Sequence, residues 1–467
     1  MLFKVTLAAA LLLPVLADSC SPAWGQCGGY VPAILQCFAA IAFVFFTNCL
    51  DSCIQPGKDG PAPLAAGPTT TTKAATTTKA STTTTNTKAP TTVATTTTKT
   101  TTIPAPTATG SCAINAYDAT AIANAKNSCS TITVGSFTVP GGETLDFTGL
   151  KKGTTLNLRG TITFGYKEWG GPLMSISGDS INVDGTGSLL NAQGEKYWDG
   201  LGGNGGKTKP RTLFLKSISN SHLKNIKILN PPVNTISLHA TNTIVEGFII
   251  DASAGDTGGG HNTDAFDIGS NGLILRNCWV HNQDDCTAIN SGYNITVSGL
   301  TCIGGHGLSI GSVNSDTLVN LVTFSDSIVQ KSANGVRIKT KAAATNGGVT
   351  NVTYKNIKVQ DITGYGIVVQ QDYGNTGHPG TGMPITVSLW ISAVPGFFLL
   401  HFDTISQPPL NTTQNLVMQN ITGNVVSGKT PVRIECGSGA CSNWNWSKIS
   451  ISGGKNSCNY TPNGFTC

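Results

Sequence analysis

Three ionisable side chains in this sequence share one spacing. Asp264, Asp285 and His306 follow one another at intervals of 21 residues, and Asp284 adjoins the second of them. If the chain coils once every 20–30 residues, side chains with this spacing stack on one face. Adjacent parallel strands are roughly 4.8 Å apart, so the carboxylates and the imidazole would lie within about 10 Å of each other.

Carboxylates held this close influence one another's ionisation. They cannot all ionise freely, so one of them should stay protonated and can donate its proton. The others can deprotonate a water molecule, which an inverting glycosidase places between carboxyls typically about 6.5–9.5 Å apart. Arg337 and Lys339 alternate with Ile338, so both point to one side of a strand and could hold a substrate carboxylate. The residues predict hydrolysis of an acidic polysaccharide, without deciding which aspartate is the acid.

Each of these residues, taken singly, has a simpler interpretation. An Asp-Asp pair is commonly a turn or a solvated edge, a histidine between glycines is commonly a turn residue, and Arg-Ile-Lys is commonly an amphipathic edge. The aspartates could also bind calcium, although the spacing is not that of an EF-hand. The shared spacing favours an active site, because chance placement rarely produces it.

The elements that must position these residues are short β-branched strands. They begin, at offsets of 22, 30, 22, 27 and 30 residues, at Ile226, Phe248, Cys278, Leu300, Ser327 and Ile357. No helical period lies between them, which disfavours βαβ units. The pattern predicts an all-β domain, a right-handed parallel β-helix, with a sandwich or a propeller as the alternative. The Ala-rich stretch 113–127 is predicted to be a helix that caps the open end of the solenoid.

Composition and the N-terminal residues indicate an extracellular protein. Gly accounts for 55 of the 467 residues and only 11% are charged, which is typical of an all-β protein with many turns. Residues 1–17 are typical of a secretory signal whose apolar run is too short to span a membrane. Fourteen cysteines agree with export, as do six Asn-X-Ser/Thr sequons, at Asn294, Asn351, Asn411, Asn420, Asn445 and Asn459.

The net charge of +5 does not indicate a nucleic-acid partner. Four of the positive charges lie in one stretch without acidic residues, at Lys73, Lys79, Lys88 and Lys99. The rest of the chain is close to neutral, so any attraction for an anionic substrate must be local. We expect a monomer with no nucleic acid and no membrane among its partners.

Four ordered motifs resemble the signature of glycoside hydrolase family 28: Asn262-Thr263-Asp264, Asp284-Asp285, Gly305-His306-Gly307 and Arg337-Ile338-Lys339. The flanking segments 279–283 and 307–313 are similar to those of fungal endo-polygalacturonases, and the resemblance covers roughly residues 111–467. It implies inverting hydrolysis of α-1,4-linked galacturonan, the backbone of pectin, without a cofactor or a metal.

The resemblance also implies a role for each site residue. Asp284 would be the proton donor, Asp264 with Asp285 would activate the water, and His306 would support the protonation of the acid. The substrate would be bound by Arg337, Lys339, Tyr373, Asn262 and Gln370. The family's disulfides map to Cys112–Cys129, Cys286–Cys302, Cys436–Cys441 and Cys458–Cys467. They leave Cys278 over, which we interpret as a buried strand residue rather than a nucleophile.

Two segments precede the predicted catalytic domain, 111–467. Residues 58–110, rich in Thr, Lys, Ala and Pro, resemble an O-glycosylated linker. Residues 18–57 carry five cysteines and resemble a fungal-type cellulose-binding module at their edges, where a strip that stacks on sugar rings would be formed by Trp24, Phe45 and Phe46. Their apolar middle departs from that pattern, so a degenerate module and one that binds cellulose are both compatible with the sequence.

A second departure is the segment 387–414, which interrupts the strand pattern of the β-helix. We hypothesise a translated intron, because Val387-Ser388 and Gln414 can be encoded by donor and acceptor sequences and removal would join Thr386 to Asn415. If the segment is present in the protein, we expect an exposed apolar loop.

Three other functions compete with polygalacturonan hydrolysis. A pectate lyase combines acidic and basic residues on a β-helix, but it generally depends on calcium. A related hydrolase could act on rhamnogalacturonan or from chain ends. A non-enzymatic carbohydrate-binding surface protein would fit the linker and the N-terminal module.

Overall fold

The computed structural model describes residues 112–344, 346–374 and 415–467. The predicted signal 1–17, module 18–57 with Trp24, Phe45 and Phe46, and linker 58–110 lie outside the described residues. So does the segment 387–414. Within the described residues no helix is long and apolar enough to cross a membrane.

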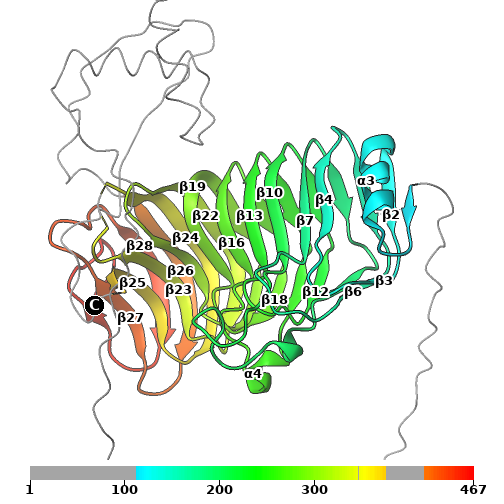
Figure 1. Cartoon of the computed structure of the whole chain (residues 1–467). Helices are drawn as coiled ribbons and strands as arrows, with labels where there is room; N and C mark the ends of the chain where they lie inside the picture. Colours follow the sequence, from blue (N-terminus) through cyan, green and yellow to red (C-terminus); the bar gives the residue numbers. More distant parts are fainter. Residues whose placement is uncertain (1–111, 345, 375–414) are drawn as a thin grey trace, which may run out of the picture. The chain divides into compact units, whose positions relative to one another are not determined.

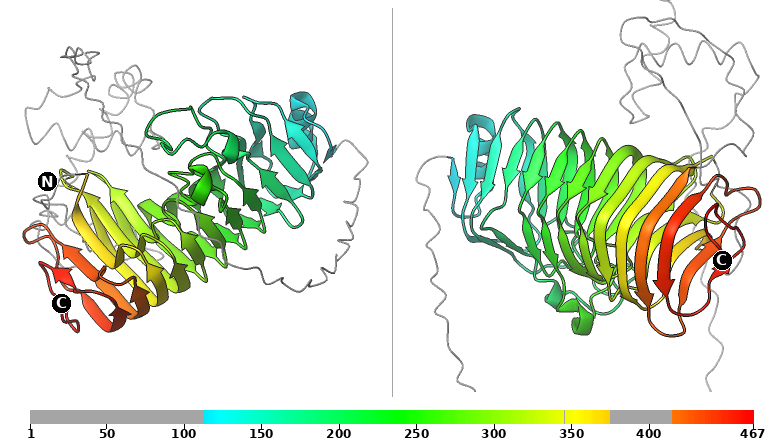
Figure 2. Two further views of the ribbon diagram at one scale, coloured as in Figure 1. Left: turned by 90° about the horizontal axis from the view of Figure 1, so that it is seen from below. Right: turned by 180° about the vertical axis from the view of Figure 1, so that it is seen from behind.

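The described residues form a parallel β-helix whose coils stack along one axis (Figures 1 and 2). Twenty-nine strands belong to one continuous sheet, and every pairing between them is parallel. This confirms the predicted β-helix and excludes the sandwich and the propeller. The pairings group the strands into three faces, A, B and C.

Face A carries the candidate site. Its strands are Leu145–Leu150 (β4), Met174–Asp179 (β7), Leu213–Ser219 (β10), Ile236–Thr241 (β13), Phe266–Asn271 (β16), the first part of Thr287–Ser298 (β19), Leu308–Val313 (β21), Asn334–Lys341 (β23), Tyr365–Tyr373 (β25), Thr430–Glu435 (β27) and Ser457–Cys458 (β29).

Face B adjoins face A through tight turns. It consists of Ala113–Ile114 (β1), Thr131–Val134 (β2), Thr155–Leu158 (β5), Asn182–Asp184 (β8), His222–Lys224 (β11), Ile244–Glu246 (β14), Ile274–Arg276 (β17), the second part of β19, and the first parts of Leu318–Gln330 (β22), Gly348–Ile362 (β24), Leu416–Val425 (β26) and Asn445–Ser452 (β28).

Face C contains the strands that the sequence analysis found. They are Phe137–Val139 (β3), Thr161–Phe164 (β6), Leu189–Asn191 (β9), Lys227–Leu229 (β12), Ile249–Asp251 (β15), Trp279–Asn282 (β18), Thr301–Gly304 (β20) and the later parts of β22, β24, β26 and β28. The register pairs Ile249 with Trp279, Trp279 with Thr301 and Thr301 with Ile328. The predicted period is therefore one coil of this helix.

A helix covers the first coil, but it is shorter than predicted. Helix α3 spans Ala119–Ser128 and not 113–127, because Asp118 caps its first turn by accepting bonds from the backbone N–H groups of Thr120 and Ala121. Ala113–Ile114 instead pair with β2 as a short strand. α3 buries Ile122 and Ala125 against the core. Two shorter elements lie in loops that lead from face C to face A: Gly194–Lys196 (η2) follows β9, and Gly255–Gly258 (α4) follows β15. Figure 1 shows α4.

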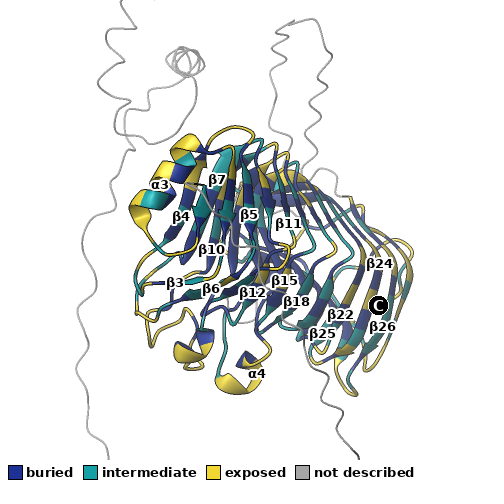
Figure 3. Ribbon diagram, turned by 90° about the vertical axis from the view of Figure 1, so that its right-hand side faces the viewer, coloured by how far each residue is buried: buried dark blue, intermediate teal, exposed yellow. Residues whose placement is uncertain are grey.

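The interior is a continuous column of aliphatic and aromatic side chains from all three faces (Figure 3). The four expected disulfides are present, Cys112–Cys129, Cys286–Cys302, Cys436–Cys441 and Cys458–Cys467. Cys278 is buried and unpaired, and burial raises the pKa of its thiol to about 12. A thiol that stays protonated is a poor nucleophile, which agrees with its interpretation as a core residue.

Candidate active site

The predicted stack of ionisable residues lies at one level of face A, just before the strands begin. Phe266 pairs with Thr287 and Thr287 with Leu308, and two residues upstream of these stand Asp264, Asp285 and His306. Backbone bonds extend the register to this level, since the amide of Ala265 donates to the carbonyl of Asp285 at 2.9 Å. The 21-residue spacing therefore does bring these side chains together.

Buried amide and hydroxyl groups fix the loop that carries the aspartates. The Nδ2 atom of Asn282 donates to the carbonyl of Thr263 at 2.9 Å and to that of Asp285 at 3.0 Å. The hydroxyl of Thr263 bonds to the side chain of Gln283 at 2.9 Å and to its backbone N–H at 2.8 Å. Two neighbouring coils are thereby tied together below the carboxylates, which limits their movement.

Asp284 is held by three donors and is strongly acidic. Its carboxylate accepts a bond from Asn262 Nδ2 at 2.9 Å, lies 2.9 Å from His306 Nδ1, and accepts its neighbour's backbone N–H at 2.8 Å. Burial opposes ionisation, but the bond and charge of His306, the backbone N–H of Asp285 and the charge of Lys339 together outweigh it and lower the pKa of Asp284 to about 2. In this arrangement Asp284 is an anion.

Asp285 is the most enclosed of the three carboxylates, with a side-chain exposure of 1%. Its oxygens contact Ser309 Oγ at 2.5 Å, Lys339 Nζ at 2.5 Å and Arg337 Nη1 at 3.8 Å. A buried charge is tolerated only with partners of this kind. Lys339 therefore holds Asp285 in place, a contact that the sequence analysis did not anticipate.

Asp264 is the member of the cluster that retains a proton. Burial raises its pKa well above the ordinary value, and the negative charges of Asp284, Asp267 and Asp285 raise it further. One amide, Asn234 Nδ2, reaches both Asp264 Oδ1 at 3.1 Å and Asp267 Oδ2 at 3.0 Å. This raised pKa agrees with the expectation that one carboxyl stays protonated. The raised pKa belongs to Asp264, whereas the family resemblance assigns the acid to Asp284.

A second group of predicted residues lies on the strands that follow. The ring of Tyr373 has three cations 5.1–5.3 Å from its centre, those of Arg337, Lys339 and Lys341. Gln370 pairs with Lys339 in the sheet, and its Nε2 atom donates to Asp372 at 3.2 Å. Arg337 keeps a buried Nε–H without a hydrogen-bond partner in the described part of the chain. Because protein covers this Nε–H, an anionic ligand would instead contact the rest of the guanidinium, whose Nη1 lies 3.8 Å from Asp285.

Four residues of the site were not predicted: Asn234, Asp267, Ser309 and Arg211. Asp267 and Ser309 lie just after two of the motifs, at positions that alternate with core residues, and this alternation was a signal that could have found them. Burial raises the pKa of Asp267 to about 6, while the positive charge of Arg211 opposes that rise.

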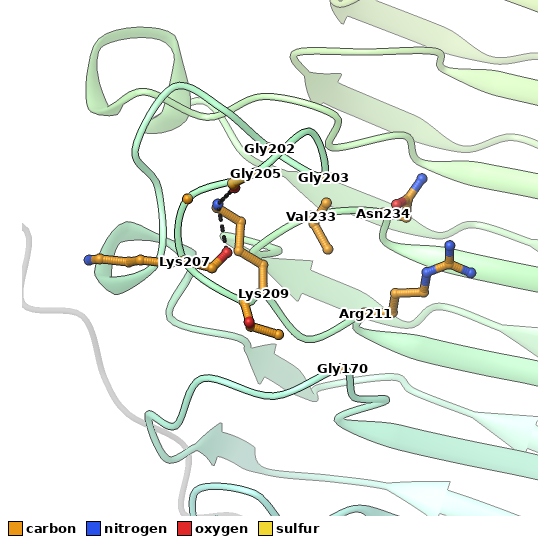
Figure 4. A pocket seen from close by; sticks show the side chains of 11 residues that line it. Gly170, Gly202, Gly203, Gly205, Lys207, Lys209, Arg211, Val233 and Asn234 are labelled. Carbon is orange, nitrogen blue, oxygen red and sulfur yellow. Dashed lines mark hydrogen bonds between the residues drawn. The ribbon is translucent and has the colours of Figure 1, made fainter. Parts of the chain in front are cut away.

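A cavity of about 380 Å³ continues the site toward the N-terminal coils (Figure 4). Arg211 and Asn234 lie at one end of it, and Lys207 and Lys209 at the other. Lys209 is buried and paired with Asp199 at 2.9 Å, so it stabilises the loop. Arg211 is exposed and has no ion pair or side-chain hydrogen bond within the described ranges. It is free to contact an anionic ligand.

The cluster also has the spacing of a possible metal site, but its contacts are unfavourable to a cation. Asp284, Asp285 and His306 offer ligand atoms within 4.8 Å of one another. Lys339 Nζ already lies against Asp285, and its charge would repel a cation. Hard cations such as calcium require six to eight oxygen ligands, which this set does not supply.

Comparison with known proteins identifies the family of this chain. The family described as Glycosyl hydrolases family 28 matches residues 129–393 and 403–467. A polygalacturonase from Penicillium griseoroseum is 46% identical over 372 residues, which are 77% of this chain and 91% of that protein. Endopolygalacturonase I from Aspergillus aculeatus is 46% identical over 357 residues, 75% of this chain and 87% of that protein.

A solved structure gives the same result. Endopolygalacturonase I from Stereum purpureum, complexed with two galacturonate, has a TM-score of 0.64 and 35% identity. The match covers 74% of this chain and 96% of the chain of that structure. The chain is a glycosidase that belongs to family 28 of the glycosyl hydrolases.

Proposed function

We propose that this chain is an endopolygalacturonase that hydrolyses α-1,4-galacturonosyl linkages within polygalacturonan. The observation that carries the proposal is the pairing of two unlike sites on face A. Three carboxylates converge at one level of the stack, and the cations of Arg337 and Lys339 on β23 lie beside the ring of Tyr373. The first site suits glycoside hydrolysis, and the second suits the carboxylate that each galacturonosyl residue carries.

In the proposed mechanism Asp284 protonates the glycosidic oxygen, and Asp264 with Asp285 deprotonates the attacking water. The positive charge of Lys339 helps to lower the pKa of Asp284. A substrate carboxylate beside Arg337 and Lys339 would offset that charge and raise the affinity of Asp284 for a proton. The proton held by Asp264 would then pass to Asp284, which leaves Asp264 ionised as the base. The coupled carboxylates thus reach the catalytic protonation state when substrate is bound.

Other residues position the substrate in this proposal. Tyr373 lines the cleft beside the cations, and Asn262 holds Asp284 from the coil below. Arg211 and Asn234 extend the cleft along the chain axis, which fits attack within a polymer rather than at its end. A secreted enzyme would encounter pectin as a polymer.

Two measurements on polygalacturonate test the proposal. Proton NMR of the first product should show the β-anomer, because attack by water from the opposite face inverts the α-linkage. Early products should be oligomers of mixed length. An unsaturated, ultraviolet-absorbing product that requires calcium would indicate a lyase. Release of monomer alone would indicate action from chain ends.

A further inference from the structure

On the side of the solenoid away from the aspartates, the turns of three successive coils carry an unusual set of residues. Asn294, Leu321 and Asn351 all have left-handed backbone conformations, with φ of 55°, 54° and 49°. The register pairs Tyr293 with Asn320 and Ile295 with Val322, which sets Asn294 beside Leu321. It continues to Asn351 on the next coil. Three successive coils therefore place equivalent turn residues in a row.

The row differs in how its side chains are bonded. Asn351 Nδ2 donates to Asn320 Oδ1 at 2.9 Å, and its own oxygen accepts from Asn415 at 3.0 Å. Asn294 has Gly272 on one side and Leu321 on the other, and neither residue has a polar side-chain group that can bond to an amide. No side-chain hydrogen bond to Asn294 exists among the residues the structure describes. Its amide is exposed and free.

Leu321 has no structural reason to be where it is. A bulky side chain in the left-handed conformation is strained. The side chain of Leu321 is also 51% exposed. It borders a groove of about 340 Å³, a size typical of small-ligand pockets, which is lined by Asn294, Thr296, Leu321, Thr323, Asn351, Thr353, Asn415 and Val417. The groove thus combines the apolar side chains of Leu321 and Val417 with a row of hydroxyl groups.

We infer that Asn294 carries an N-linked glycan and that its first N-acetylglucosamine lies in this groove against Leu321. Asn294-Ile295-Thr296 is an acceptor sequon. The apolar face of the sugar would cover Leu321, and its hydroxyls would meet Thr296, Thr323 and Thr353. The inference rests on the predicted secretory signal and is independent of the proposed catalytic function.

The other described sequons are less suited to this role. Attachment to Asn351, Asn420 or Asn459 would use an Nδ2 atom that donates a hydrogen bond in the fold. Asn445 has its oxygen bonded to Asn463 at 2.8 Å and does not line the groove. Asn294 alone, among the sequons that the structure describes, joins a free amide to a shaped surface.

The site is tested by mass spectrometry of glycopeptides from the full chain secreted by a yeast. Asn294 is expected to be occupied in most molecules. An unmodified Asn294 in the secreted protein would overturn the inference.

The seating of the sugar needs a second measurement. Asn294→Gln and Thr296→Val remove the sequon in different ways and should each lower the Tm by about 2 °C. Trimming to the first N-acetylglucosamine should leave the Tm unchanged, and in a Leu321→Gly background the loss should disappear. Glycans elsewhere are the same in all variants, and activity on polygalacturonate reports folding. Equal Tm values with and without the sequon would rule out the seated sugar.

Discussion

Two stacks of polar side chains run along this β-helix. The same stacking geometry produces attraction between neighbours in one of them and repulsion in the other. At the turn between faces B and C, Asp326, Asn356 and Asn420 form a ladder in which each amide donates to the coil before it, at 2.8 and 3.0 Å. On face A the equivalent stack brings together carboxylates that repel one another. One carboxyl must keep a proton there, and two cations are needed to hold another.

The difference shows how a solenoid separates stability from chemistry. In the ladder every donor meets an acceptor, so the stack contributes to folding and has no capacity left for a ligand. On face A the stack leaves an unsatisfied donor on Arg337 and a shared proton among the aspartates. Repetition of one coil supplies both, and only the identity of the stacked residues differs. Substitutions in the two stacks should therefore affect different properties.

The largest effect is expected at Asp284. Asp284→Asn keeps the shape of the side chain but replaces one acceptor oxygen by an NH2 group and removes the transferable proton, so kcat on polygalacturonate should fall by a factor of at least about 10³. The Tm should change little. Steady-state kinetics and a thermal melt measure both quantities. A variant with more than a tenth of the parent activity would contradict the assignment of Asp284 to catalysis.

A smaller effect is expected at the two cations, and it should differ between them. Arg337→Ala should mainly raise KM, by about 10–100-fold, because its guanidinium lies as far as 3.8 Å from Asp285 and its charge remains for the substrate. Lys339→Ala should lower kcat and the Tm as well, since it leaves Asp285 with its buried charge poorly paired. Kinetics on polygalacturonate together with melts distinguish the two patterns. Identical profiles would show that Lys339 has no separate structural role.

Asp267 gives a prediction for stability as a function of pH. Its pKa is raised from 3.8 to about 6, so the folded protein binds this proton more tightly than the unfolded chain does. Stability is lost as the pH rises through that interval, because the buried carboxyl must ionise. Asp267→Asn should therefore be more stable at pH 7, by about 3 kcal/mol, and no more stable below about pH 4. Melts at both values check this, and an advantage that does not vary with pH would contradict it.

The smallest effect on activity is expected in the ladder. Asn356→Ala removes two ladder bonds and places alanine, which tolerates the left-handed conformation less well than asparagine, at a φ of 55°, so it should cost about 1–2 kcal/mol of stability. Asn356→Gly is the matched control, because glycine tolerates that φ and loses only the bonds. Neither change should alter kcat. A large loss of activity would show that the two stacks are coupled.

Much of this structure follows from spacing in the sequence. The strands of face C were predicted because their β-branched cores recur once per coil, and the stack of Asp264, Asp285 and His306 because its coils are of equal length. Coil length is not constant elsewhere, since Asn234 lies 30 residues before Asp264. A fixed period therefore misses Asn234. Pairing of Lys339 with Asp285 depends on side-chain reach across two coils, which spacing does not encode.

In the proposed mechanism Asp284 is the acid, although its pKa is about 2 in this arrangement, and Asp264 becomes the base. An oligogalacturonide with a nitrophenyl leaving group tests it, because such a leaving group departs without protonation. We expect Asp284→Asn to regain most of the parent activity on this substrate, and Asp264→Asn to remain inactive on it. Rescue of Asp264→Asn and not of Asp284→Asn would reverse the two roles and contradict the account.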